Sequence, residues 1–232
     1  MKVTPAVFIH IPKTAGTSLG VALRKHYSAI DEHYPPEGIR YTRHPDDVDC
    51  VMGHFAYGFN RHILGERESF EFTFLREPRK RFISQLRYDF KFFSELDSPH
   101  SPGLPEIVNA DSIWEFVERN ELLYFDNCLV RYLSGRWNYA PLGTLTQRDL
   151  DLAKENLMHL DFVGDVDSYE ADVRRLGDLL GFQIEVLTEN RGDYTAENTL
   201  LDESVIPEQF VEMDAELYRF YTDFVRMENG HD

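Results

Sequence analysis

Residues 7–18 have the sequence Val-Phe-Ile-His-Ile-Pro-Lys-Thr-Ala-Gly-Thr-Ser. The apolar run Val7–Ile11, rich in β-branched and aromatic residues, predicts a buried strand. The turn Pro12–Ser18 follows, and we expect a helix from there to about His26. A strand, a tight turn and a helix start place free backbone N–H groups around a concavity at the positive end of the helix dipole. This stretch predicts an anion-binding loop in an α/β fold; an ordinary βα turn is the alternative.

The loop is not a Walker A motif. That motif is G-x-x-x-x-G-K-[ST], with its lysine directly after the second glycine, whereas Lys13 lies three residues before Gly16. Lys13 still supplies a point charge, and the Thr17 and Ser18 hydroxyls supply further hydrogen-bond donors.

A second strand-to-helix junction carries basic residues. Phe72–Leu75 predicts a strand, and Pro78 suits the first turn of the following helix. Arg76 follows the strand, at the edge where parallel sheets bind ligands. Ser84 falls about two turns into the helix, so Arg76 can grip a phosphate with two hydrogen bonds while Ser84 donates a third. The alternative is a capping arginine and a surface serine.

A histidine follows a third predicted strand, Val48–Met52, in the sequence Met-Gly-His-Phe. Histidine has a pKa near neutrality and can take a proton from a hydroxyl. His54 is therefore a candidate general base, with a purely structural histidine as the alternative.

The rest of the chain predicts further alternation of helices and strands. Residues 31–49, polar and with three prolines, predict a loop, and residues 94–110 predict an excursion from the core. Asp111 and Thr146 are candidate N-caps. Phe162–Gly164 predicts a strand, and a helix is expected to start near Tyr169 and stop at Gly181. Pro207 opens the last predicted helix, whose buried stripe is Phe210, Met213, Leu217, Phe220 and Phe224.

Length and composition set outer limits. The 232 residues, 42% of them hydrophobic, fit a single globular domain spanning 1–232. A formal net charge of −17 argues against nucleic-acid or anionic-membrane partners. The two cysteines, Cys50 and Cys128, lack metal-ligand spacing, and we expect no metal. The N-terminal apolar run is too short for a signal peptide or a membrane span, which predicts a cytoplasmic protein.

These segments together resemble the sulfotransferases that use 3′-phosphoadenosine 5′-phosphosulfate (PAPS). Ile9–Leu19 resembles their 5′-phosphosulfate loop, and Leu75–Ser84 their 3′-phosphate motif, with Arg-Glu-Pro in place of the usual Arg-Asp-Pro. Gly53-His54 matches the position of the general base proposed for the carbohydrate branch, which includes heparan sulfate 2-O-sulfotransferase and its bacterial relatives. Residues 127–135 and 162–164 are similar to later, weaker family blocks.

The resemblance implies a P-loop-like three-layer α/β fold with a central parallel sheet flanked by helices. It also implies direct in-line transfer of a sulfuryl group from PAPS to a hydroxyl of a carbohydrate or small-molecule acceptor. Lys13 and His54 are then the catalytic residues. The donor-binding residues are Lys13, Thr14, Ala15, Gly16, Thr17, Ser18, Arg76 and Ser84. A P-loop small-molecule kinase and a non-catalytic nucleotide-binding module of the same fold are the alternatives.

Overall fold

The computed structural model describes residues 4–34, 44–95, 105, 108–137, 139–186 and 202–226. In this part of the chain five parallel strands form one sheet in the order β2-β3-β1-β4-β5. The strands are β1 (Ala6–Ile9), β2 (Ile30–His33), β3 (Cys50–Gly53), β4 (Phe70–Leu75) and β5 (Phe162–Asp165). The strand predicted from the opening motif is thus the central one, and β3 and β4 flank it.

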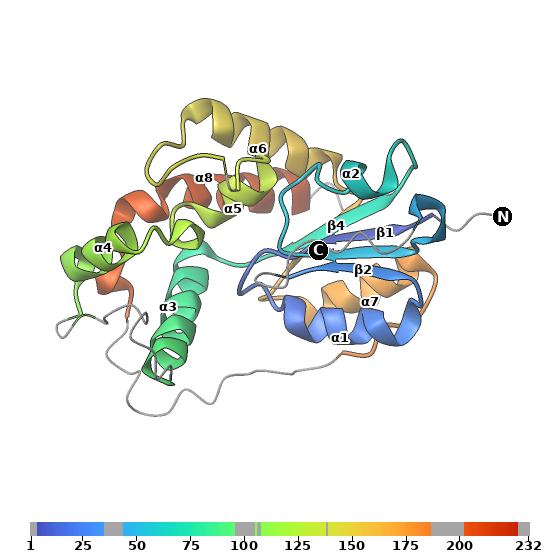
Figure 1. The fold of residues 1–232 in the computed structure, drawn as a ribbon, viewed down its shortest axis with the longest axis horizontal. Helices are drawn as coiled ribbons and strands as arrows, with labels where there is room; N and C mark the ends of the chain where they lie inside the picture. The colour runs from blue at the N-terminus through green and yellow to red at the C-terminus, as the bar shows by residue number, and fades with distance from the viewer. Residues whose placement is uncertain are drawn as a thin grey trace.

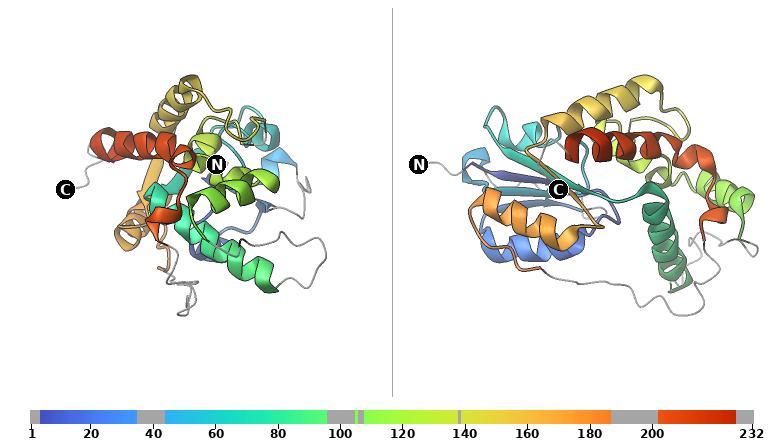
Figure 2. Two further views of the ribbon diagram at one scale, coloured as in Figure 1. Left: turned by 90° about the vertical axis from the view of Figure 1, so that its left-hand side faces the viewer. Right: turned by 180° about the vertical axis from the view of Figure 1, so that it is seen from behind.

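Helices cover both faces of the sheet, so the predicted three-layer α/β fold is confirmed (Figures 1 and 2). One face carries α1 (Gly16–His26) and α7 (Tyr169–Leu180). The other carries α5 (Cys128–Leu133), α6 (Gln147–His159) and α8 (Glu212–Phe220). Beyond the carboxyl ends of the strands lie α3 (Pro78–Glu95) and α4 (Ala110–Arg119). The shorter elements are α2 (Arg61–Leu64), the 3₁₀ turns η1 (Pro45–Asp47), η2 (Leu123–Phe125), η4 (Glu203–Val205) and η5 (Glu208–Phe210), and the π-helix η6 (Tyr221–Val225).

The central strand is apolar throughout because both of its faces are buried. Side chains alternate across a strand, and Val7 and Ile9 pack into the core beneath α5, α6 and α8. Ala6 and Phe8 pack on the opposite face with residues of α1 and α7. A continuous hydrophobic run is the pattern expected for a strand buried on both faces of a parallel sheet.

The predicted loop over 31–49 is wrong at its start, where the chain forms the edge strand β2. Its sequence is polar, but buried and more exposed residues alternate along it. Asp31 and His33 are buried, whereas Glu32 points outward and pairs with Arg24 of α1 at 2.7 Å. An edge strand packs against one neighbour only, so its sequence carries a weaker apolar signal. Residues 35–43 of the predicted loop, and most of the excursion predicted at 94–110, lie outside the described residues.

Of the two predicted N-caps, only Thr146 is correct. It caps α6, and its N–H and hydroxyl donate to the Asp149 carboxylate at 2.8 and 2.7 Å. Helix α4 instead begins one residue before Asp111, with Asn109 as its cap in a reciprocal pair with Ser112.

The last helix differs from its prediction at both ends. Pro207 precedes the short turn η5, and α8 begins only at Glu212. Near its end the helix widens into η6, whose extra residue per turn shifts the register. Tyr221 and Val225 are therefore buried, while Phe224, expected in the buried stripe, is 60% exposed.

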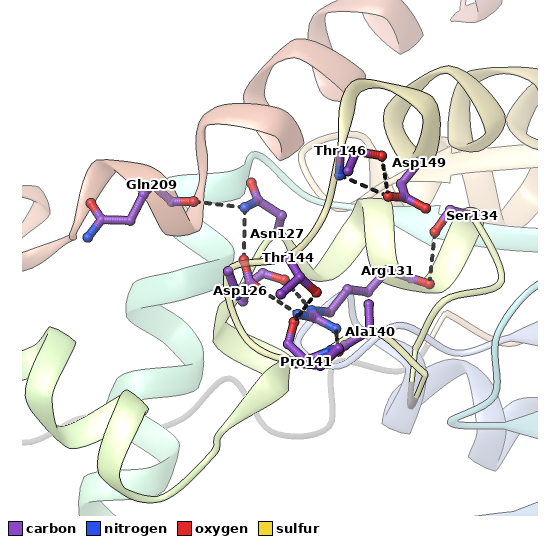
Figure 3. Close-up of polar contacts among 11 residues, drawn as sticks. Asp126, Asn127, Arg131, Ser134, Ala140, Pro141, Thr144, Thr146, Asp149 and Gln209 are labelled. Atoms are coloured by element: carbon purple, nitrogen blue, oxygen red, sulfur yellow. Dashed lines mark hydrogen bonds and ion pairs between the residues drawn. The ribbon is translucent and has the colours of Figure 1, made fainter.

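A buried ion pair fixes the chain between α5 and α6 (Figure 3). The Arg131 guanidinium is paired with the Asp126 carboxylate, and both side chains are almost fully buried. Arg131 also donates to the carbonyls of Asp126, Ala140 and Pro141 at 2.9, 2.6 and 2.9 Å. Asp126 additionally accepts the Gly143 N–H at 2.8 Å. Because each charge is paired and hydrogen-bonded, the desolvation cost of burial is offset.

Replacing Arg131 by Met is expected to lower the free energy of unfolding by about 3–5 kcal/mol, because Asp126 then stays buried without its cation. Arg136→Met is the matched control. Arg136 lies 3.4 Å from Asp149, but its side chain is 47% exposed, so its loss should cost at most about 1 kcal/mol. Urea unfolding measures both. Equal losses of unfolding free energy in the two variants would contradict the assignment of Arg131 and Asp126 as a buried ion pair.

Candidate active site

The three predicted motifs meet at one edge of the sheet. Lys13, His54 and Arg76 follow β1, β3 and β4, three adjacent strands that run in the same direction. The space above their carboxyl ends is a cavity of about 1330 Å³. The predicted residues in its wall are Lys13, Ala15, Gly16, Thr17, Ser18, His54, Arg76 and Ser84.

Thr14 is the predicted binding residue that lies beneath the cavity wall. It is fully buried, and its hydroxyl donates to the Ile11 carbonyl at 2.8 Å. This bond holds the turn closed. On either side of it Lys13 and Ala15 have φ values of 69° and 64°, a left-handed conformation that costs a non-glycine residue about 1–2 kcal/mol. Such strained residues cluster at ligand sites.

Gly16 is required by a close approach to the ring of His10. A Cβ at position 16 would lie 2.0 Å from His10 Cδ2, far inside van der Waals contact. The His10 ring is buried, stacks on Phe8 of β1, and forms part of the cavity wall. His10 therefore supports the loop from directly beneath Gly16.

The imidazole of His54 is held by the backbone of His10. Its Nδ1 lies 2.7 Å from the His10 carbonyl oxygen. A carbonyl only accepts hydrogen bonds, so in neutral His54 Nδ1 carries the proton and Nε2 keeps a lone pair. Burial lowers the pKa of His54 below its usual 6.5, although the bond to His10 partly opposes this. The side chain is thus a neutral imidazole at pH 7, with the protonation state that a general base needs.

Lys13 is the basic residue of the turn itself. Its Nζ lies 4.4 Å from the centroid of the Tyr88 ring, within the range of a cation–π contact. The pKa of Lys13 is lowered to about 8, chiefly by burial, with smaller contributions from Asp89, which raises it, and from Arg76 and Arg81, which lower it. Lys13 is therefore still mostly protonated at pH 7.

The basic cluster at the start of α3 separates into three groups. Arg76 and Arg87 line the cavity, and Arg76 Nη1 donates to the Lys13 carbonyl at 3.3 Å. Arg79 and Lys80 form ion pairs with Glu208 and Asp167. The third group is Arg81, which is fully buried and donates to the Tyr124 carbonyl at 3.0 Å.

Helix α3 contributes more to the cavity than its serine. Residues four apart share a helix face, and the rows Ser84–Tyr88–Phe92 and Gln85–Asp89–Phe93 all belong to the cavity wall. Sequence reasoning missed Asp89. Its spacing gave a weak signal, since Asp89 lies four residues after Gln85 in the helical row beside that of Ser84, but the residue stands in an aromatic stretch that predicts core packing.

Asp89 is a buried carboxylate in a cavity of cations. It is 3% exposed, and Gln85 Nε2 donates to its Oδ1 at 2.8 Å. Burial raises the pKa of Asp89 to about 6, while the Tyr124 hydroxyl, the Gln85 amide, Lys13 and Arg81 hold it down.

Of the later family blocks, residues 162–164 belong to β5, whereas residues 127–135 partly connect helices and partly line the cavity. Asn127, in a left-handed conformation, accepts from the N–H groups of Met213 and Asp214 and donates to the Gln209 carbonyl at 2.8 Å (Figure 3). It therefore joins α5 to α8. Tyr132 of the same block lies in the cavity wall beside Trp137, with ring centroids 4.5 Å apart. Residues 166–171, after β5, complete the wall.

The described ranges contain no candidate metal site and no candidate membrane span. No group of three or more His, Cys, Asp or Glu side chains there is placed to hold a metal ion. None of the helices there is long and apolar enough to cross a membrane. Independence from metal stays a prediction.

The fold is a P-loop-like α/β fold, and the candidate anion-binding loop follows its central strand. The sequence model of the Sulfotransferase family matches residues 3–222, and the chain belongs to that family. This membership supports sulfuryl transfer as its general chemistry. A search of curated protein sequences gave no significant match.

The state of His54 can be tested without any substrate. Because burial disfavours the cation, its imidazole should titrate with a midpoint below 6.5 and be neutral at pH 7. Ring ¹⁵N NMR, assigned with His54→Gln, should show Nδ1 protonated and Nε2 bare. A midpoint above 6.5, or the opposite tautomer, would contradict the described geometry.

Proposed function

We propose that this protein transfers a sulfuryl group from PAPS to a hydroxyl of a carbohydrate or small-molecule acceptor by direct in-line transfer. The observation that carries the proposal is the meeting of Lys13, His54 and Arg76 in one cavity, each after one of three adjacent strands. A cation, a neutral base and a second anion-binding group are the parts that sulfuryl transfer needs at one place.

The residues present fit the donor. The strained turn at Lys13 and Ala15 precedes the start of α1, and free amides at a helix start bind phosphate. We assign the 5′-phosphate to the backbone N–H groups of residues 15–18, with the Thr17 and Ser18 hydroxyls assisting. Arg76 and Ser84, both in the cavity wall, are assigned to the 3′-phosphate. This second site distinguishes PAPS from ATP.

The chemistry then divides between two side chains. PAPS supplies the activated sulfuryl group. Lys13, protonated at neutral pH, stabilises the negative charge that grows on the leaving oxygen as its bond to sulfur breaks. His54 Nε2 takes the proton of the attacking hydroxyl, while the His10 carbonyl keeps the ring oriented and stabilises the imidazolium formed. Positioning and charge stabilisation supply most of the rate, as in phosphoryl transfer.

The donor assignment predicts a selective stabilisation. Adenosine 3′,5′-bisphosphate should raise the Tm clearly, because a ligand that binds only the native state stabilises it by mass action. ADP, which lacks the 3′-phosphate, should do much less, and Arg76→Ala should remove most of the difference. Thermal unfolding with each nucleotide measures this. Equal shifts from ADP and the bisphosphate would reject the 3′-phosphate site and favour the kinase alternative.

The catalytic assignment predicts different effects at the two residues. His54→Ala should lower kcat by about 100- to 10,000-fold, the usual contribution of a general base, with bisphosphate affinity nearly unchanged. Lys13→Ala should reduce both, because Lys13 is assigned to the donor as well. Turnover with radiolabelled PAPS measures the rates, and His54→Gln is the gentler change in volume. If His54→Ala keeps more than about a tenth of the activity, the base lies elsewhere.

A further inference from the structure

The acceptor end of the cavity has a recognisable chemistry of its own. Beyond Ser84 the cavity face of α3 continues with Tyr88 and Phe92, whose rings are parallel within 7° at 6.1 Å and are 49% and 46% exposed. Tyr132 and Trp137 form a second aromatic pair in the same wall. Exposed ring faces in a cavity suit a ligand that presents flat apolar faces of its own.

Two buried polar atoms in this wall are left over, although the Asp89 carboxylate accepts from Gln85 through its other oxygen and interacts with the Tyr124 hydroxyl. Asp89 Oδ2 and Tyr132 Oη are buried, and neither makes a hydrogen bond within the part of the chain that is described. Asp89 is 3% exposed and Tyr132 is fully buried. Buried polar groups are normally paired, and each exception requires an explanation. One of these atoms accepts hydrogen bonds and the other donates, so both are matched by a ligand that offers several hydroxyl groups.

The charges of the cavity disfavour an ionic acceptor. Lys13 and Asp89 interact electrostatically across this region, so an anion placed there meets Asp89 and a cation meets Lys13. The basic side chains in the wall are Lys13, Arg76, Arg87 and Arg174. The wall also carries the carboxylates of Asp89, Asp167 and Glu170, and Glu170 pairs with Arg174 at 3.3 Å. A bound donor with a phosphate monoester, a phosphodiester-like phosphate and a sulfate brings about four negative charges, which is more than the cations of the wall carry once these carboxylates are counted. No surplus of positive charge is left for an anionic acceptor.

We propose that the acceptor is a neutral sugar ring, held between the aromatic side chains, and that Asp89 is the residue that excludes anionic sugars. The inference rests on the proposed function, because it needs the donor to occupy the cations. One apolar face of the sugar packs across Tyr88 and Phe92, whose parallel rings lie side by side along α3 with centroids 6.1 Å apart. Its hydroxyls hydrogen-bond to Asp89 and Tyr132 after small side-chain rotations, since both atoms lie just beneath the wall.

The test compares two acceptors of nearly the same shape, methyl β-glucopyranosiduronamide, which is neutral at C6, and methyl β-glucopyranosiduronic acid, which carries a carboxylate there, with radiolabelled PAPS as donor. The neutral glycoside should have a kcat/KM at least about tenfold higher, because like charges facing one another are disfavoured. In Asp89→Asn the ratio of the two kcat/KM values should fall several-fold. Asp167→Asn is the matched control: Asp167 also lines the cavity, but it is paired with Lys80 at 2.8 Å, and its loss should leave the preference unchanged.

Stabilisation by adenosine 3′,5′-bisphosphate, measured on the wild type and on Asp89→Asn, separates the possible failures. If the bisphosphate does not stabilise the wild type, the proposed function itself fails. If it does, a uronic acid used as well as the neutral sugar overturns the inference alone. A preference for the neutral glycoside that is unchanged in Asp89→Asn also overturns the inference. If the aryl acceptor 4-nitrophenol is sulfated and neither glycoside is, the neutral-sugar assignment is wrong. It is also wrong if neither glycoside raises the Tm of the complex with the bisphosphate.

Discussion

The residue on which the site depends is His10, at the end of the central strand. Its carbonyl oxygen lies 2.7 Å from His54 Nδ1, and its ring lies so close to Gly16 that no side chain fits there. One residue thus fixes the tautomer of the candidate base and the position of the candidate anion-binding turn. The stacking of His10 on Phe8 links both to the core of the sheet. The two halves of the proposed reaction are therefore positioned by a single residue: His54 by its backbone carbonyl, and the turn at Gly16 by its buried, uncharged ring, whose pKa is lowered chiefly by burial.

Helix α3 joins donor and acceptor in a similar way. Its first turns bring Ser84 to the proposed 3′-phosphate site, and the same face then brings Tyr88 and Asp89 to Lys13. A helix is rigid over this length, so the position of the donor and that of the acceptor wall are set together. Arg81 lies fully buried behind this face and influences the pKa of both Lys13 and Asp89. Charge in the cavity is consequently balanced over several side chains rather than held in isolated pairs.

The parts of the fold that the sequence could predict are those with strong local patterns. The continuous apolar run of β1 and the strand–turn–helix junctions at Lys13 and Arg76 predict the sheet and its ligand edge. Strand β2 was missed because only alternate polar residues are buried there. Phe224 was misplaced because a π-turn changes the helical period, which no spacing rule anticipates. Asp89 and Tyr132 owe their roles to contacts between distant segments, and such contacts become visible only once the chain is folded.

The wide turn at Tyr221–Val225 also bears on how the end of the chain can vary in length. A π-turn holds one residue more than an α-turn, so it behaves as an insertion that the helix has absorbed without breaking. Deleting one residue within it would restore the α-helical period and leave the side chains of α8 in place. Arg226, directly after the turn, would keep its face as well, because the deleted residue is the one that the wide turn accommodates. The segment is thus a natural point at which relatives of different length can be accommodated while Leu217 and the rest of the buried face stay unchanged.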